Sequence, residues 1–289
     1  MLVEKLFSNI KSIGIQATAA KAFQYLYNRI KFNFTPLKLK LKKKFVRGDL
    51  IVAHGKHKFI YYDNGDISER LYHSFWKKYY EEELNKVQNY IRKGDTVIDV
   101  GGNLGFYTLL LSELVGVNGK VFTFEPFSEN FKKLNRTISI NNLNNVDSFN
   151  VGLGEEERKA ILYYDSHQTG MSTIVYKISS DAITEEIKLT TLDKFFEKIK
   201  KKISFIKIDT EGYEPQVLLG GKRILLKDKP VICIELGGEY FESSLFALKI
   251  LKELNYDCDA FNINLKEIPA GTNFICKPNN LIERNKHPV

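Results

Sequence analysis

The residues with the clearest chemical signature are a glycine-rich turn and two acidic side chains near predicted strand ends. The stretch 97–105 reads V-I-D-V-G-G-N-L-G, a buried strand that carries Asp99 and then turns through Gly101 and Gly105. Glycines let such a turn bend sharply and approach a ligand, and the helix that follows points unpaired N–H groups at the same place. Glu125 ends the next predicted strand, where an acid can hold the two hydroxyls of a ribose.

Asp99 and Glu125 together predict a pocket for a nucleoside that carries an amino group. An acid on the strand can meet a cationic amino group, whereas it would repel a pyrophosphate. A dinucleotide site needs G-x-G-x-x-G, and the glycines here lack that spacing. A nicotinamide-dependent oxidoreductase is therefore disfavoured. The alternative for each acid is a solvated side chain at a strand end.

A second group of ionisable residues surrounds the end of the predicted strand 203–209. Lys207 and Asp209 share one face of that strand because side chains alternate along it, and Glu211 and Glu214 follow in the turn. Four such groups within eight residues favour a catalytic cluster. The alternative is an ion pair between Lys207 and Asp209, with Glu214 capping a helix.

The net charge of the 289-residue chain, +8, is concentrated in one segment. Residues 1–48 contain eleven basic residues and one acid, so they carry +10 and the remaining 241 residues carry −2. Apolar residues recur among these cations at helical spacing. This pattern predicts a peripheral contact with an anionic membrane surface; the alternative is a solvated helix packed on the domain.

No transmembrane segment is predicted, because the chain lacks a run of about 18 apolar residues. The polar residues Lys5, Ser8 and Lys11 also interrupt any signal-peptide core, so we expect a cytoplasmic protein. Cys233, Cys258 and Cys276 form no C-x-x-C pair and lie in apolar segments. They are expected to be buried, reduced thiols.

Strands and helices alternate along most of the chain, which predicts an α/β fold with a mostly parallel sheet and helices on both faces. Apolar residues at helical spacing mark three intervening helices, around Leu134, Val217 to Leu225, and Leu248. A predicted hairpin (160–164 with 172–176) and the segment 188–191 form an insertion that overhangs the carboxyl edge of the sheet. The predicted strands are 96–101, 120–125, 146–151, 203–209, 230–236, 256–261 and 273–277.

The order of these motifs resembles the FkbM-type methyltransferase family. The likeness rests on V-I-D-V-G-G-N-L-G-F-Y-T, F-E-P, T-L-D, I-K-I-D-T-E-G-Y-E-P-Q-V-L-L-G-G and P-V-I-C-I-E, which begin at residues 97, 124, 191, 206 and 230. The family commonly has alanine at Gly102. The resemblance implies a Rossmann-like, seven-stranded class I methyltransferase sheet, with S-adenosylmethionine donating a methyl group, usually to a hydroxyl oxygen.

The resemblance also implies an organisation of the chain and of its donor site. Residues 94–277 would be the methyltransferase domain, 49–93 an adaptor packed on it, 1–48 a basic extension and 278–289 a tail. Asp99 would face the methionine amino group and Glu125 would hold the ribose. The remaining donor-site residues expected to wrap the methionine or to line the adenine are Gly101, Gly102, Asn103, Gly105, Phe127 and Gly152. Phe127 as an ordinary packing residue is the alternative.

Methyl transfer to an alcohol needs a proton acceptor, because the pKa of an alcohol lies far above 7. Asp209 is the expected general base, with Lys207, Glu211 and Glu214 beside it and Glu235 completing the set. His167, in the insertion, is a second candidate. No histidine-rich ligand spacing predicts a metal site.

We therefore expect an O-methyltransferase acting on a sugar, glycan or glycolipid-linked hydroxyl. One alternative is an RNA methyltransferase that uses the basic extension to bind phosphates, although the near-neutral body and the lack of an N-P-P-Y-type motif disfavour nucleic acid. The other is a non-catalytic scaffold with a methyltransferase fold, which the intact Asp99, Glu125 and Asp209 disfavour.

Overall fold

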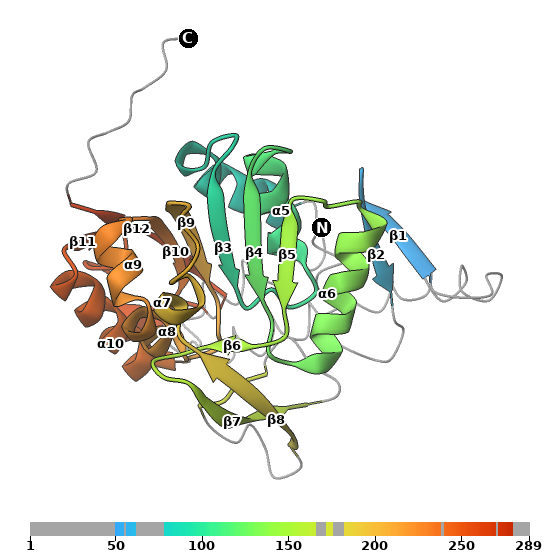
Figure 1. Cartoon of the computed structure of the whole chain (residues 1–289). Helices are drawn as coiled ribbons and strands as arrows, with labels where there is room; N and C mark the ends of the chain where they lie inside the picture. The colour runs from blue at the N-terminus through green and yellow to red at the C-terminus, as the bar shows by residue number, and fades with distance from the viewer. Residues whose placement is uncertain are drawn as a thin grey trace, which may run out of the picture.

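A seven-stranded sheet forms the centre of the molecule, in the order β11-β12-β10-β9-β3-β4-β5 (Figure 1). β12 runs antiparallel to β10 and β11, whereas the other neighbouring strands are parallel to one another. All seven predicted strands are present, so the predicted α/β class I methyltransferase architecture is confirmed. Their bounds are β3 Thr96–Val100, β4 Lys120–Phe124, β5 Val146–Phe149, β9 Ile203–Ile208, β10 Val231–Glu235, β11 Tyr256–Cys258 and β12 Asn273–Pro278.

The structure is a computed structural model of the chain. The residues that it describes are 50–54, 56–61, 78–165, 172–175, 182–237, 240–269 and 271–279. The predicted basic extension, residues 1–48, and nearly all of the predicted tail, 278–289, lie outside them. Within these residues, no helix has the length and apolar character needed to cross a bilayer.

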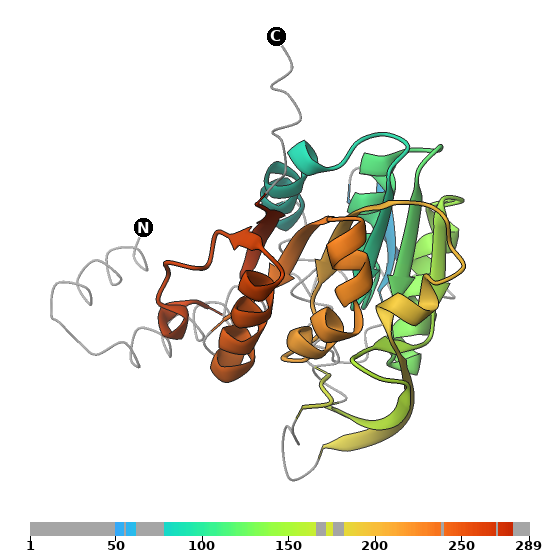
Figure 2. The same ribbon diagram turned by 60° about the vertical axis from the view of Figure 1, so that its left-hand side comes forward.

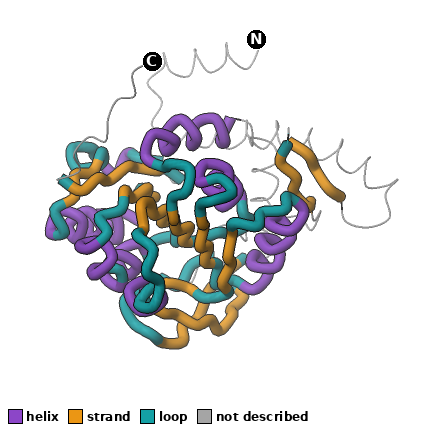
Figure 3. Tube along the Cα trace, turned by 45° about the horizontal axis from the view of Figure 1, so that its top comes forward, coloured by secondary structure: helices purple, strands orange, loops and turns teal. Residues whose placement is uncertain are grey.

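Helices cover both faces of the sheet (Figure 2 and Figure 3), so the central strand β3 is buried on both sides. Val97 and Val121 pack with α5 (Phe106–Val115), and the helix 78–87 lies on the same face. Ile98 and Phe122 point the other way. The helices that cover their face are α7 Leu192–Phe195, α8 Glu214–Gly220, α9 Lys222–Lys227 and α10 Phe241–Glu253. The described residues also include the short 3-10 helices η1 Gln88–Tyr90 and η4 Leu265–Glu267.

The predicted single helix around Val217 to Leu225 is in fact the pair α8 and α9. Gly220 and Gly221 separate the two helices, and Gly221 ends one and begins the other. A Cβ at Gly220 would lie 1.9 Å from the carbonyl oxygen of Gly154. The break therefore coincides with a close approach between backbones that only glycine permits.

The insertion forms a second sheet of three strands in the order β6-β8-β7. In Figure 1, β3, β4 and β5 run towards this sheet, so it lies across their carboxyl ends, as expected. The predicted hairpin partner is wrong, because β7 pairs with β8 along seven residues. Among the described residues 172–175 of the predicted partner strand, only Thr173 bridges to β7, at Tyr163. The three strands are β6 Gly152–Leu153, β7 Arg158–Tyr164 and β8 Ile183–Thr190.

A small hairpin precedes the main domain. It consists of β1 (Leu50–His54) and β2 (His57–Tyr61), which pair antiparallel. The ring of Phe59 stacks on Phe106 at a centroid distance of 4.2 Å. This hairpin therefore packs on α6 (Ser128–Ile140) and on the start of α5.

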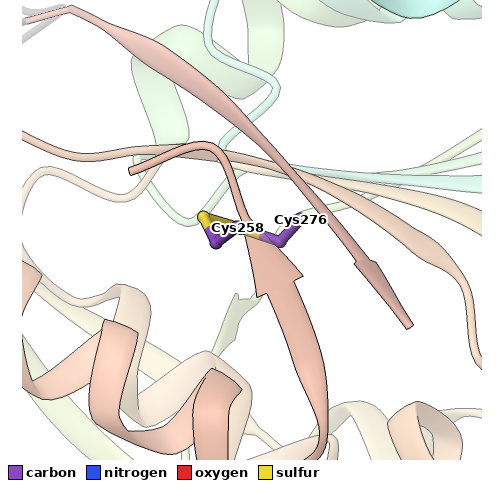
Figure 4. The surroundings of a disulfide bond; sticks show 2 residues. All are labelled: Cys258 and Cys276. Atoms are coloured by element: carbon purple, nitrogen blue, oxygen red, sulfur yellow. A yellow bond between two sulfur atoms is a disulfide. The ribbon is translucent and has the colours of Figure 1, made fainter. Parts of the chain in front are cut away.

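The cysteine expectation is wrong for two of the three residues. Cys258 and Cys276 lie directly opposite each other on β11 and β12, with their Cα atoms 4.0 Å apart, and form a disulfide (Figure 4). Cys233 is a free and buried thiol, as expected. Burial in apolar segments is visible in the sequence, but the register that places two of these side chains face to face is not.

We expect reduction of this disulfide to lower the free energy of unfolding by about 3 kcal/mol, because it closes a loop between residues 18 positions apart. Urea unfolding with and without reductant measures the difference. In a Cys258→Ser/Cys276→Ser variant the reductant should have no effect. Alkylation of three thiols in the untreated, unfolded chain would contradict the pairing.

Candidate active site

The glycine turn after β3 is shaped by its contact with the end of β9. Gly101 has a φ of +88°, and a Cβ there would lie 1.8 Å from the carbonyl oxygen of Asp209. The N–H groups of Gly101 and Gly102 both donate to the carbonyl of Phe124, at the end of β4. Gly105, with a φ of +87°, then begins α5. The turn thus holds the carboxyl ends of β3, β4 and β9 together.

Asp99 is buried, and only one of its carboxylate oxygens is engaged. Oδ2 accepts a hydrogen bond of 2.5 Å from Thr108 on α5 and a longer one of 3.5 Å from Thr123 on β4. Oδ1 is buried without a hydrogen-bond partner. Burial raises the pKa of Asp99 to about 6, although the Thr108 hydroxyl and the Lys207 ammonium oppose the shift. An incoming cationic donor would satisfy this oxygen.

Glu125 connects the glycine turn to the turn after β4. Its Oε2 accepts from the N–H of Asn103 at 2.8 Å, and its Oε1 accepts from the N–H of Phe127 at 2.9 Å. Burial raises the pKa of Glu125 to about 7 against these two N–H groups. The Oδ1 of Asn103 is buried without a partner, like that of Asp99. Beside the glycine turn, the Oδ1 atoms of Asp99 and Asn103 are therefore two buried acceptors without a donor.

Phe127 packs against the insertion sheet, and Gly152 begins its strand β6. The Phe127 ring is buried and packs on Tyr164 of β7 at a centroid distance of 4.4 Å. A Cβ at Gly152 would lie 2.6 Å from Leu189 of β8. Both residues therefore connect the carboxyl edge of the central sheet to the insertion sheet. Their contact with adenine stays a prediction.

Lys207 is a buried cation surrounded by carboxylates. Its Nζ lies 3.1 Å from Oδ2 of Asp209 and 5.2 Å from the centroid of the Tyr107 ring. Burial disfavours its charge, but the surrounding negative charge, that of Asp209 first, outweighs burial and raises the pKa of Lys207. The ammonium of Lys207 therefore holds the Asp209 carboxylate in place through this ion pair.

Asp209 and Glu235 form a pair of carboxyl groups at the ends of β9 and β10. They are hydrogen-bonded to each other, and burial together with the charge of Asp209 raises the pKa of Glu235 well above its ordinary range. Glu235 also accepts from the N–H of Gly271 at 2.8 Å. The raised pKa favours the protonated form of Glu235, beside the Asp209 carboxylate, whose side chain is 28% exposed.

Glu214 faces into the turn that follows Asp209. Its Oε1 accepts from the N–H groups of Thr210 and Gly212 at 2.9 and 3.2 Å, and from the Thr210 hydroxyl at 3.0 Å. Burial raises the pKa of Glu214. These contacts describe a side chain that stabilises the turn.

Glu211 has a left-handed φ of +53° and accepts a hydrogen bond of 2.9 Å from the Tyr240 hydroxyl. Its carbonyl accepts from Thr173 of the insertion at 2.7 Å. Glu211 therefore links the turn to both the insertion and the start of α10. His167 lies outside the described residues, among which no three acidic, histidine or cysteine side chains converge on a possible metal site.

The sequence reading missed a polar network behind Lys207. Glu83, on the helix 78–87, accepts from the Tyr107 hydroxyl at 3.3 Å and from the Asn273 amide at 3.1 Å, and the Tyr107 hydroxyl also lies 3.4 Å from the Cys233 sulfur. Tyr107 stands inside the recognised motif, next to the Thr108 that binds Asp99. The place of Tyr107 and Thr108 in this motif could have indicated a role in the site. No motif surrounds Glu83, so its contacts could not be read from the sequence.

Comparison with known proteins identifies the family. Residues 99–258, more than half of the chain, match the methyltransferase FkbM domain. A curated relative, Methyltransferase 1 of Beauveria bassiana (strain ARSEF 2860), is 24% identical over 143 residues, which are 43% of this chain and 57% of that protein. The match therefore spans less than two thirds of the relative.

Solved structures also align, at low sequence identity. A methyltransferase FkbM from Methylobacillus flagellatus KT aligns with a TM-score of 0.45 and 16% identity, covering 75% of this chain and 55% of that one. Aeropyrum pernix fibrillarin, solved with natively bound S-adenosyl-L-methionine, aligns with a TM-score of 0.45 and 11% identity over 80% of this chain and 83% of that one.

S-adenosylmethionine is the cofactor, and the polar groups beside the glycine turn fit it. The unpartnered oxygens of Asp99 and Asn103 would accept from its amino group, and Glu125 retains lone pairs for ribose hydroxyls. The sulfonium supplies an electrophilic methyl group when the cofactor is bound. With its glycine turn, its carboxyl-edge acids and the match over residues 99–258, the chain belongs to the methyltransferase FkbM domain family.

Proposed function

We propose that this chain is an S-adenosylmethionine-dependent O-methyltransferase with a sugar or glycan hydroxyl as its acceptor. The observation that carries the proposal is the Asp209–Glu235 pair, which lies directly beside the glycine turn. An alcohol must lose its proton as the new bond forms, and a carboxylate at the site can accept it. A sugar hydroxyl is an acceptor of this kind.

Each residue of the cluster has a separate task in this proposal. Asp209 accepts the hydroxyl proton, and Lys207 holds its carboxylate in place at 3.1 Å. Glu235, whose pKa is raised, stays protonated and hydrogen-bonded to Asp209, so the second carboxyl adds no charge to repel the first. The backbone contact between Gly101 and Asp209 fixes the distance between donor turn and base, which is proximity catalysis.

The test is methyl transfer from labelled S-adenosylmethionine to a panel of glycans, glycolipids, RNA and protein. Label in an ether, stable to mild alkali and recovered as a methylated sugar after acid hydrolysis, would support the proposal. Label released by alkali indicates a carboxyl ester, and nuclease-sensitive label indicates RNA. Either result would replace the proposed acceptor while keeping the donor.

Donor binding should strengthen as the pH rises from about 5 to 7. Asp99 has a raised pKa of about 6, so it holds a proton at low pH that must leave before it can meet an ammonium group. Affinity for S-adenosylhomocysteine, which carries the same amino group, should rise up to about tenfold per pH unit below pH 6. Calorimetry in buffers of different ionisation enthalpy should detect the proton released.

The matched control is Asp99→Asn, which keeps the size of the side chain and cannot titrate. It should bind more weakly and lose most of the pH dependence; Glu125, whose pKa of about 7 is also raised, accounts for the remainder. An unchanged pH profile in Asp99→Asn would exclude Asp99 as the partner of the ammonium. S-adenosylhomocysteine should also raise the melting temperature, whereas NAD should not.

A further inference from the structure

The amino edge of the sheet carries a cluster of lysines that the near-neutral charge of the domain conceals. They lie in the loop that leads into β9, at the end of α9 and in the loop that leads from α9 into β10, and all are exposed. The loops are adjacent, because the N–H of Ile203 donates to Asp228 at 3.0 Å. We name this surface the basic edge. Its residues are Lys198, Lys200, Lys201, Lys202, Lys227 and Lys229.

Three acids lie in the same segments as the basic edge, Asp193, Glu197 and Asp228, against its six lysines, so the surface keeps an excess of positive charge. Asp228 is engaged by the backbone of Ile203, and Asp193 accepts from the N–H groups of Arg223 and Ile224 at 2.8 and 2.9 Å. Among the described residues, none of the six lysines forms an ion pair, whereas Lys194 close by is paired with Glu157. Unpaired like charges in one place cost free energy, so a partner that supplies negative charge would relieve it.

Exposed apolar side chains accompany these cations. Leu226, directly before Lys227, is 55% exposed, and Val117, in the loop that leads into β4 at the same edge, is 93% exposed. Among the described residues, the exposed aromatic side chain is that of Phe246, which is 44% exposed and lies on α10, away from this edge. Proteins hold single-stranded RNA by aromatic stacking together with cations. The basic edge has exposed aliphatic side chains where such a site would have aromatic ones.

We infer that the basic edge is a binding surface for an anionic phospholipid bilayer. Lysine ammonium groups are attracted to anionic headgroups by about 1 kcal/mol each, and exposed aliphatic side chains between them can enter the headgroup region. The inference is independent of the acceptor and concerns the described domain itself, whereas the membrane contact predicted from residues 1–48 falls outside the described residues.

Binding through this edge would leave the active site open. β9 begins at the basic edge and ends just before Asp209, and a six-residue strand spans about 20 Å. The carboxyl edge therefore faces away from the bilayer in this arrangement. Methyl transfer and membrane contact can then occur together.

The test is co-sedimentation of the full chain with phosphatidylcholine vesicles that contain or lack phosphatidylglycerol. The variant Lys200→Gln/Lys201→Gln/Lys202→Gln should bind the anionic vesicles on the order of a hundredfold more weakly. The matched control, Lys78→Gln/Lys132→Gln/Lys188→Gln, makes the same charge change at exposed lysines elsewhere and should bind nearly as well as the unmodified chain. Residues 1–48 are common to all three proteins and cancel in the comparison.

Equal losses in the two triple variants would overturn the inference, because only overall charge would then matter. RNA binding that depends on the basic edge, without vesicle binding, would also overturn it. Leu226→Ser should weaken vesicle binding and leave binding to heparin unchanged, since heparin offers charge without an apolar layer. If the first variant unfolds, Lys227→Gln/Lys229→Gln at the same edge should show a loss on the order of tenfold.

Discussion

Asp209→Asn is expected to lower the turnover number at least a hundredfold while donor affinity stays near that of the unmodified protein. General bases contribute roughly 10²–10⁴-fold, and the amide cannot accept the acceptor's proton. Asn is nearly isosteric and still offers an oxygen to Lys207, so the buried cation keeps a partner. Steady-state kinetics with the acceptor that the labelling test identifies, together with calorimetry for S-adenosylhomocysteine, separates chemistry from binding.

Two neighbouring carboxamide variants are the controls for this result. Glu214→Gln keeps an oxygen for the three hydrogen bonds that its Oε1 accepts, so turnover should fall only a few-fold, about the effect of weakened neutral hydrogen bonds. Glu211→Gln likewise keeps an acceptor for the Tyr240 hydroxyl. Full activity in all three variants would remove this turn from the mechanism.

The sheet was predictable because its strands are buried on both faces and therefore appear as short apolar runs between turns. β8 was largely missed for the opposite reason. It lies at the surface and carries Glu185, Glu186 and Lys188, and the first two of these discourage a strand assignment. In the structure the charged side chains are accommodated by surface contacts, and Glu186 pairs with Lys159 across the strands.

The candidate site was predictable in its residues and only partly in its contacts. Asp99, Glu125 and Asp209 each lie at or next to the end of a different strand, and the sequence pattern shows where these strands end. The hydrogen bond between Asp209 and Glu235, and the approach of Glu83 to the same cluster, depend on how β10 and the helix 78–87 pack against β9. Such contacts between distant segments leave no local pattern in the sequence.

Gly101→Ala should remove donor binding and destabilise the fold more than any other single substitution considered above. The first cost is conformational: φ is +88°, and a left-handed conformation costs an L-residue roughly 1–2 kcal/mol. The second is steric, since the new Cβ would lie 1.8 Å from the carbonyl oxygen of Asp209. Separating these backbones adds about 1–3 kcal/mol, as in other overpacked sites.

Gly94→Ala is the matched control, because it isolates the steric cost from the conformational one. Gly94 has nearly the same φ, +90°, yet a Cβ there meets nothing within 4 Å. Its free energy of unfolding should fall by about 1–2 kcal/mol and its donor affinity should be unchanged. Urea unfolding and calorimetry with S-adenosylhomocysteine measure both quantities. If the two alanine variants lost equal stability and bound the donor equally well, the contact between Gly101 and Asp209 would not be what joins the glycine turn to the end of β9.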